Sequence, residues 1–245
     1  MDPRDKVALI TGGARIGRTV AQELARRGCH VALTYRGSRA SAEETAAAVE
    51  ALGARGLAVQ ADLEDEQAVG AAVDAVRARL GRLDILVLMA SLYEKRPFGA
   101  LDAPVWRSNL DANLRSAYLL ALKAAPLMKA QGGGRVVTFA DWLPVSGRPR
   151  YRGYLPYYVS KAGVIGLTES LALELAPEIL VNAVAPGPIL KPPGFSDKAD
   201  RQVRKVTPLG RWGGPAEIAK AVLFLIDTEF VTGECLRVDG GRHLY

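Results

Sequence analysis

A tyrosine and a lysine four positions apart are the residues best suited to chemistry. The stretch from Tyr157 to Lys161 opens a predicted helix, which places these two side chains one turn apart on the same face. A nearby ammonium group favours the phenolate, lowers the pKa of the tyrosine and makes its phenol a usable acid near neutral pH. Tyr154 and Tyr158 lack this spacing, so we interpret them as packing residues. The pair predicts a centre for proton transfer.

A glycine-containing loop near the start of the chain is typical of a phosphate-binding turn. The run Thr11-Gly12-Gly13-Ala14-Arg15-Ile16-Gly17-Arg18 follows a predicted strand and leads into a helix. Glycines allow a tight turn and a close approach to a pyrophosphate, while the helix N-terminus supplies amide donors and the positive end of its dipole. A plain strand-to-helix turn is the alternative. We expect Gly12, Arg15, Ile16 and Arg18 to contact a dinucleotide.

The residues after the next predicted strand indicate which dinucleotide binds. Enzymes that use NAD usually have Asp or Glu there, which binds the ribose hydroxyls. This chain has Thr34-Tyr35-Arg36-Gly37-Ser38-Arg39, without an acid. Arg36 would bind a phosphate on the ribose, helped by the Ser38 hydroxyl and by Arg15 or Arg18. A surface role is the alternative for Arg36. NADPH is the predicted cofactor.

Alternating strands and helices must position these residues. Continuous apolar runs predict strands over residues 6–11, 30–35, 56–60, 85–89, 135–140, 180–183 and 236–239. Amphipathic patterns predict helices over residues 16–27, 41–52, 64–80, 105–130, 157–175 and 215–227. This alternation implies a doubly wound parallel sheet with helices on both faces and the ligand outside the carboxyl ends of its strands. We predict a single α/β domain spanning residues 1–245, with segment 190–207 as a mobile substrate lid.

Composition narrows the class of protein. The 245 residues are 49% apolar and 24% charged, as in ordinary globular domains. No apolar run approaches the ~18–20 residues that span a bilayer, and the run from Val7 to Ile10 is too short for a signal peptide. The net charge is +6, but the basic residues are scattered and mixed with acids, which argues against a nucleic-acid site. Cys29 and Cys235 lie far apart, which argues against a disulfide framework and a metal site. We expect a cytoplasmic protein that binds a small-molecule substrate and neither membrane nor nucleic acid.

Several motifs recur in a family-specific order across nearly the whole chain. They are Thr11-Gly12, Asp62 after the third predicted strand, Ala90-Ser91 after the fourth, Asn113, the Tyr157/Lys161 pair and Pro186-Gly187. Together they resemble the short-chain dehydrogenase/reductase family. The resemblance implies an oxidoreductase with a seven-stranded Rossmann fold, usually assembled as a homotetramer.

The same resemblance implies roles for individual residues. Asn113 would anchor a proton-relay water beside Lys161, which would also hold the nicotinamide ribose. Asp62 would contact the adenine, with Leu63 and Ala90 beside the cofactor. The stretch Pro186-Gly187-Pro188-Ile189 would line the nicotinamide.

The end of the fifth predicted strand departs from the family pattern. Most members have a serine there, whose hydroxyl helps to hold a carbonyl oxygen, whereas this chain has Asp141. An ionised aspartate would repel the alkoxide that develops as a ketone is reduced. It would favour a substrate that presents N–H groups or takes up a proton on nitrogen. Pteridine reductases and dihydromonapterin reductases are similar in having this aspartate, and Ser91 and Tyr93 also match them, with an aromatic ring that stacks on the pterin.

Other departures leave alternatives open. The phosphate loop is one residue shorter than usual, Leu88-Met89 replaces a polar pair, and the spacing of 16 between Asp141 and Tyr157 is longer than the family's. Asp141 could instead cap a turn, with Ser146 supplying the hydroxyl. The main hypothesis is NADPH-dependent reduction of a C=N bond in a pterin or folate-like ring. The alternatives are a ketone or 3-oxoacyl reductase and a non-catalytic NADPH-binding regulatory protein.

Overall fold

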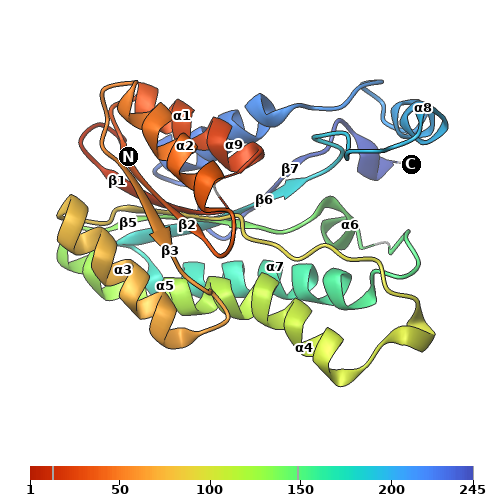
Figure 1. Ribbon diagram of the computed structural model, residues 1–245, viewed down its shortest axis with the longest axis horizontal. Helices are drawn as coiled ribbons and strands as arrows, with labels where there is room; N and C mark the ends of the chain where they lie inside the picture. Colours follow the sequence, from red (N-terminus) through yellow and green to blue (C-terminus); the bar gives the residue numbers. More distant parts are fainter. Residues whose placement is uncertain (13, 148, 245) are drawn as a thin grey trace.

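The computed structural model describes residues 1–12, 14–147 and 149–244, so Gly13 of the predicted phosphate loop lies outside the described residues. A parallel sheet of seven strands runs through the middle of the molecule in the order β3-β2-β1-β4-β5-β6-β7 (Figure 1). The strands are β1 (Val7–Thr11), β2 (His30–Tyr35), β3 (Gly56–Gln60), β4 (Ile85–Leu88), β5 (Gly134–Phe139), β6 (Ile179–Pro186) and β7 (Cys235–Val238). The predicted doubly wound sheet is confirmed. Because the strand order reverses between β1 and β4, the carboxyl ends of these two strands mark the expected ligand site.

Helices cover both faces of the sheet (Figure 1). One face carries α1 (Ile16–Arg26), α2 (Arg39–Glu50) and α9 (Pro215–Asp227), and the other carries α3 (Glu66–Leu80), α4 (Ala103–Leu110), α5 (Ser116–Ala130) and α7 (Leu155–Leu175). Two separate apolar clusters fill the space between sheet and helices, one on each side. Burial of the strands on both faces explains why they read as continuous apolar runs rather than alternating ones.

The long helix predicted over residues 105–130 is interrupted. A π-helical segment from Asp111 to Arg115 separates α4 from α5. Such bulges leave the regular i→i−4 pattern and occur often at functional sites. The segment contains Asn113, so the irregularity lies at a predicted site residue. Amphipathic periodicity does not reveal it because apolar spacing continues through the bulge.

Two helices are absent from the sequence predictions. The single turn α6 (Trp142–Val145) follows β5, and α8 (Asp197–Lys205) lies within the segment predicted as a lid. The first is one turn long and the second is polar and exposed, so neither produces the apolar pattern by which helices are recognised. Strand β6 also runs to Pro186, three residues beyond its predicted end.

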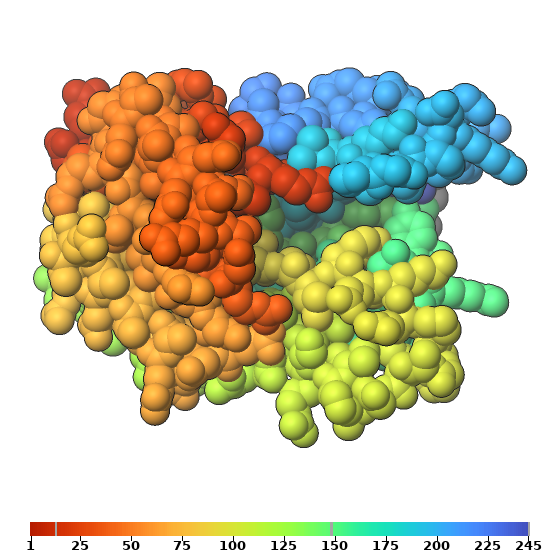
Figure 2. All heavy atoms as spheres, viewed as in Figure 1, coloured from red at the N-terminus to blue at the C-terminus, as the bar shows by residue number. Residues whose placement is uncertain are grey.

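A hollow opens on one face of the molecule. Figure 2 shows it between the yellow segment that follows β4 and the blue segment that carries α8. Within the described ranges, no helix is long and apolar enough to cross a membrane. The same part of the chain holds no cluster of three or more His, Cys, Asp or Glu side chains suited to a metal ion.

Candidate active site

Tyr157 and Asp141 meet at the carboxyl end of β5. The Tyr157 hydroxyl donates a hydrogen bond of 2.9 Å to Oδ2 of Asp141, and the tyrosine is only 8% exposed. The long spacing between the two residues therefore does not move the aspartate out of reach. The backbone amide of Leu143 donates to Oδ1 at 2.8 Å, so Asp141 also caps the N-terminus of α6. Asp141 therefore both caps this turn and contacts Tyr157.

Ser146 does not take the place of the family's strand-end serine. Its hydroxyl lies 2.9 Å from the carbonyl oxygens of Trp142 and of Leu143 and donates within α6. The hydroxyl hydrogen is thus used inside this single turn. Asp141 is the polar group that faces Tyr157.

Lys161 lies beneath this pair, one helical turn beyond Tyr157. Its side chain is 2% exposed, and Nζ donates to the carbonyl oxygen of Phe139 at 2.7 Å. Nζ also lies 6.0 Å from the centre of the Tyr157 ring. Burial lowers the pKa of Lys161 from 10.5 to about 8, and the Asp141 carboxylate opposes this shift. Lys161 therefore changes charge close to neutral pH.

The pKa of Tyr157 shifts opposite to the sequence-based prediction. Burial raises it well above 10, and the adjacent carboxylate of Asp141 raises it further. Burial also raises the pKa of Asp141, although the bonds from Leu143 and Tyr157 and the charge of Lys161 oppose that shift. The prediction that Lys161 lowers the tyrosine pKa is wrong here because desolvation and a carboxylate at hydrogen-bond distance outweigh the ammonium. Both shifts favour the protonated, neutral forms of Tyr157 and Asp141.

Asn113 fixes the backbone beside the pair. Its side-chain amide accepts from the Leu92 amide at 2.6 Å and donates to the Leu92 carbonyl at 3.0 Å. It also lies 2.9 Å from Oγ of Ser160 on α7. Asn113 therefore connects the π-helical segment, the segment after β4 and helix α7.

Tyr93 belongs to an aromatic cluster at the mouth of the site. Its ring stacks on Tyr154 with centres 4.7 Å apart and an interplanar angle of 17°. It meets Tyr157 edge-on, also at 4.7 Å, and remains 57% exposed. Tyr154, interpreted from the sequence as a packing residue, packs within this cluster. The helical spacing to Lys161 could not reveal its position, because Tyr154 lies at the N-cap of α7.

A cavity of about 680 Å³ runs along the carboxyl ends of β1, β2 and β4. Many of the predicted cofactor and substrate residues line it, namely Gly12, Arg36, Ser38, Asp62, Leu63, Ala90 and Ser91. Gly12 has a φ of 79°, and a Cβ at Gly17 would collide with the Gly12 carbonyl oxygen. Thr11 accepts a hydrogen bond from the Ala90 amide at 2.9 Å, which ties the loop to the end of β4. The glycine cradle, the cavity and its polar lining fit a dinucleotide.

Arg36 lies at one end of this cavity, between acids. Its Nη1 is 3.0 Å from Glu64 and 4.0 Å from Asp62, and its side chain is 69% exposed. Exposed ion pairs of this kind contribute little to stability, so an incoming phosphate can displace Glu64 from the guanidinium. Arg18 likewise pairs with Glu44 at 3.5 Å on α2.

The remaining predicted cofactor residues do not line the cavity. Arg15, at the N-cap of α1, has a strained φ of 53°, and Ile16 begins that helix. Pro186 ends β6, and a Cβ at Gly187 would collide with Asp239 on the segment after β7. Ile189 is buried against the α9 side of the core. The cavity therefore gathers the residues predicted for the adenine and the ribose phosphate together with Ala90 and Ser91. The other residues predicted for the phosphate loop and the nicotinamide lie outside its lining.

Known proteins share this arrangement over the whole chain. A family model described as Enoyl-(Acyl carrier protein) reductase matches residues 13–243. The solved short-chain dehydrogenase/reductase of Serratia marcescens has a TM-score of 0.91 at 34% identity, covering 99% of this chain and 100% of that one. The chain belongs to the short-chain dehydrogenase/reductase family. Its members are oxidoreductases, and so is this protein.

The relatives of this chain differ in the substrates that their names state. The 3-oxoacyl-[acyl-carrier-protein] reductase of Staphylococcus aureus is 36% identical over 245 residues, 98% of each chain. A putative ketoacyl reductase of granaticin polyketide synthesis from Streptomyces violaceoruber is 37% identical, covering 99% of this chain and 98% of that one. A solved NADPH-dependent 3-quinuclidinone reductase from Rhodotorula rubra has a TM-score of 0.91 at 28% identity, covering 100% and 93%. These names agree with the 3-oxoacyl alternative better than with the pteridine hypothesis.

Proposed function

We propose that this short-chain reductase reduces a C=N bond in a pterin or folate-like ring with NADPH. The observation that carries the proposal is the hydrogen bond of 2.9 Å between Tyr157 and Asp141. A serine there would hold a carbonyl oxygen, whereas burial raises the pKa of Asp141 and so favours the form that can give a proton to a ring nitrogen. Two neighbouring acids suit a substrate that becomes protonated on nitrogen.

Each residue of the site has a separate role in this reduction. Bound NADPH supplies the hydride. Tyr157 and Asp141 hold the proton that balances hydride addition, which goes to the ring nitrogen as the C=N bond becomes C–N. Lys161 supplies positive charge beneath them, and Asn113 holds the Leu92 backbone against the catalytic helix. Tyr93 offers the exposed face on which a flat ring stacks.

The preference for NADPH rests on the residues around Arg36. The first positions after β2 contain this guanidinium and the Ser38 hydroxyl, and both line the cavity. Arg36 would hold a ribose phosphate, which would replace Glu64 as its partner.

A second candidate function is reduction of a 3-oxoacyl thioester. The names and identity of the curated relatives favour it. In that case a protonated Asp141 would donate to the carbonyl oxygen, as a serine does elsewhere in the family. The raised pKa of this carboxyl makes such a role chemically consistent at low pH.

The assembly and the lid complete the proposal. Helices α5 and α7 leave Tyr118, Leu122, Val159 and Leu173 exposed, and such apolar side chains are suited to burial in a homotetramer. The polar helix α8 would move over a bound substrate as part of the 190–207 lid. The mass in solution by light scattering tests the first proposal, and a monomer would refute it.

Steady-state NADPH oxidation tests the substrate class. Purified protein is given dihydrobiopterin or dihydromonapterin in one set of assays and an acetoacetyl thioester in another, with Tyr157→Phe as the inactive control. A higher kcat/KM for the pterin supports the proposal, and a higher value for the thioester favours the second candidate. Tight NADPH binding without turnover of either would indicate a non-catalytic protein.

A further inference from the structure

The position of Asp141 depends on the single helical turn that follows it. Asp141 caps α6, and α6 contains only Trp142 to Val145. One turn of helix is not stable by its own hydrogen bonds, because nucleation is costly and few bonds form. Contacts with the rest of the molecule must therefore hold the turn and, with it, the carboxylate.

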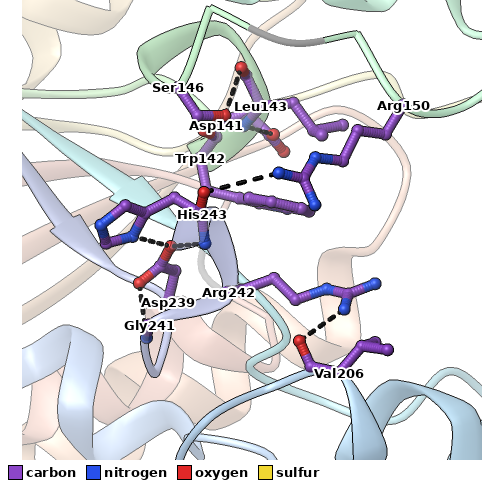
Figure 3. Close-up of polar contacts among 10 residues, drawn as sticks. All are labelled: Asp141, Trp142, Leu143, Ser146, Arg150, Val206, Asp239, Gly241, Arg242 and His243. Carbon is purple, nitrogen blue, oxygen red and sulfur yellow. Dashed lines mark hydrogen bonds and ion pairs between the residues drawn. The ribbon is translucent and has the colours of Figure 1, made fainter. Parts of the chain in front are cut away.

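Trp142 provides one such contact. It is 5% exposed, and the guanidinium carbons of Arg150 and Arg242 lie 5.4 Å and 5.5 Å from its ring centre. In Figure 3 the indole is seen nearly edge-on, with Arg150 above it and Arg242 below it. Both distances lie within the range of cation–π attraction. We call these three side chains the Trp142 bracket.

The C-terminal turn places Arg242 against the Trp142 ring. Asp239 is buried and accepts hydrogen bonds of 2.9 Å from the amides of Gly241 and His243, and its Oδ2 lies 2.8 Å from His243 Nδ1 (Figure 3). This carboxylate closes the turn. Arg150 in turn donates to the His243 carbonyl at 3.4 Å.

Arg242 also reaches the segment proposed as the lid. Its Nη1 donates to the Val206 carbonyl at 2.6 Å, directly after α8 (Figure 3). One guanidinium therefore contacts the end of α8 and the ring that follows the proton-donating carboxyl. A change in the contact of Arg242 with Val206 or with Trp142 therefore acts on the turn α6.

We propose that Trp142 is a positioning residue, and that Arg242 and Arg150 hold its ring so that Asp141 points at Tyr157. The C-terminal turn thereby becomes part of the support of the proton donor, although it touches neither Tyr157 nor the cofactor cavity. The inference rests on the proposed function only in giving Asp141 a role in proton delivery. The titratable groups that act on Asp141 are Tyr157, Lys161 and Tyr93, and the change at Arg242 leaves all three in place.

Hydrogen exchange and kinetics of Arg242→Gln test the proposal. The matched control is Arg237→Gln, the same change at an exposed position on β7. In the bracket variant we expect the amides of Leu143 and of residues 145–147 to exchange about tenfold faster, since Leu143 loses a fixed acceptor, while residues 157–161 exchange as before. We expect kcat to fall about tenfold or more, because small displacements of a reacting group are costly, with an unchanged KM for NADPH. The acid limb of the pH profile of kcat should move as well.

Two outcomes would overturn the proposal. One is exchange and kcat equal to those of Arg237→Gln, and the other is faster exchange of α6 with wild-type kcat and pH profile. The kinetic ratio is measured on whichever substrate the wild type reduces, and exchange needs no substrate, so failure of the pterin proposal remains distinguishable. If Arg242→Gln does not fold, Arg242→Lys keeps a cation near the ring, and a smaller change in the same two readouts is expected.

Discussion

Replacing Asp141 with serine should exchange one substrate class for the other. Serine is as good an N-cap as aspartate, so the hydrogen bond from the Leu143 amide and the turn α6 should be kept. The change removes the carboxylate that lies 2.9 Å from the Tyr157 hydroxyl and restores the side chain usual in the family. We expect Asp141→Ser to lose dihydropterin reduction and to gain reduction of an acetoacetyl thioester.

The magnitude follows from the charge that the carboxylate places beside the substrate. A substrate oxygen bonded to Tyr157 would lie about 4 Å from Oδ2, and two unit charges at that distance repel by about 4 kcal/mol at an effective dielectric constant of ~20. About half of the charge has developed in a transition state, which leaves roughly 2 kcal/mol, or about thirtyfold in kcat/KM. Because burial raises the pKa of Asp141, the wild-type carboxyl becomes neutral as the pH falls, and the advantage of serine should shrink in acid.

The assay compares kcat/KM for both substrates across pH in wild type, Asp141→Ser and Asp141→Asn. Asparagine keeps the shape without the charge or the acidic proton, so we expect it to lose pterin turnover as serine does. Undiminished pterin reduction by Asp141→Ser would refute the reasoning, because a proton donor cannot be dispensable. An unchanged rate with the thioester at neutral pH would show that the carboxylate does not repel the developing charge.

Three further variants test other parts of the site. Lys161→Met should inactivate the enzyme yet raise the free energy of unfolding by about 2 kcal/mol. The pKa decrease from 10.5 to about 8 corresponds to a cost of roughly 3 kcal/mol for burying the charged lysine, and loss of its hydrogen bond to Phe139 takes back about 1 kcal/mol of the gain. This gain in stability should be complete below pH 8 and vanish by about pH 10.5, where the lysine is neutral in both the folded and the unfolded chain. Denaturant titrations across pH measure it, and a loss of stability at pH 7 would contradict the reasoning. Arg36→Gln should weaken NADPH binding about ten- to a hundredfold by calorimetry and leave NADH binding unchanged; equal effects on both would exclude a phosphate contact. Tyr93→Leu should raise the KM for dihydropterin about three- to tenfold with little change in kcat, and an unchanged KM would remove the stacking role.

The sequence by itself determined the layout of this protein. Parallel strands buried on both faces leave continuous apolar runs, so the strands were predicted with small errors at their ends, and β2, β3 and α9 were predicted with their observed bounds. The order of the strands along the chain then placed the glycine loop, Arg36 and Ala90 at one edge of the sheet, where one cavity holds them. These inferences succeed because each depends on local periodicity or on a motif at a strand end.

Only the tertiary structure decided the pKa shifts and the contacts around Tyr157. The four-residue spacing of Tyr157 and Lys161 indicated a lowered tyrosine pKa, yet burial and a carboxylate 16 positions away raise it. Tyr154 and Trp142 showed no pattern of their own, because their partners come from distant segments or from turns too short to carry a period. Desolvation and contacts between segments far apart in sequence depend on the packed chain, and no spacing within the sequence encodes them.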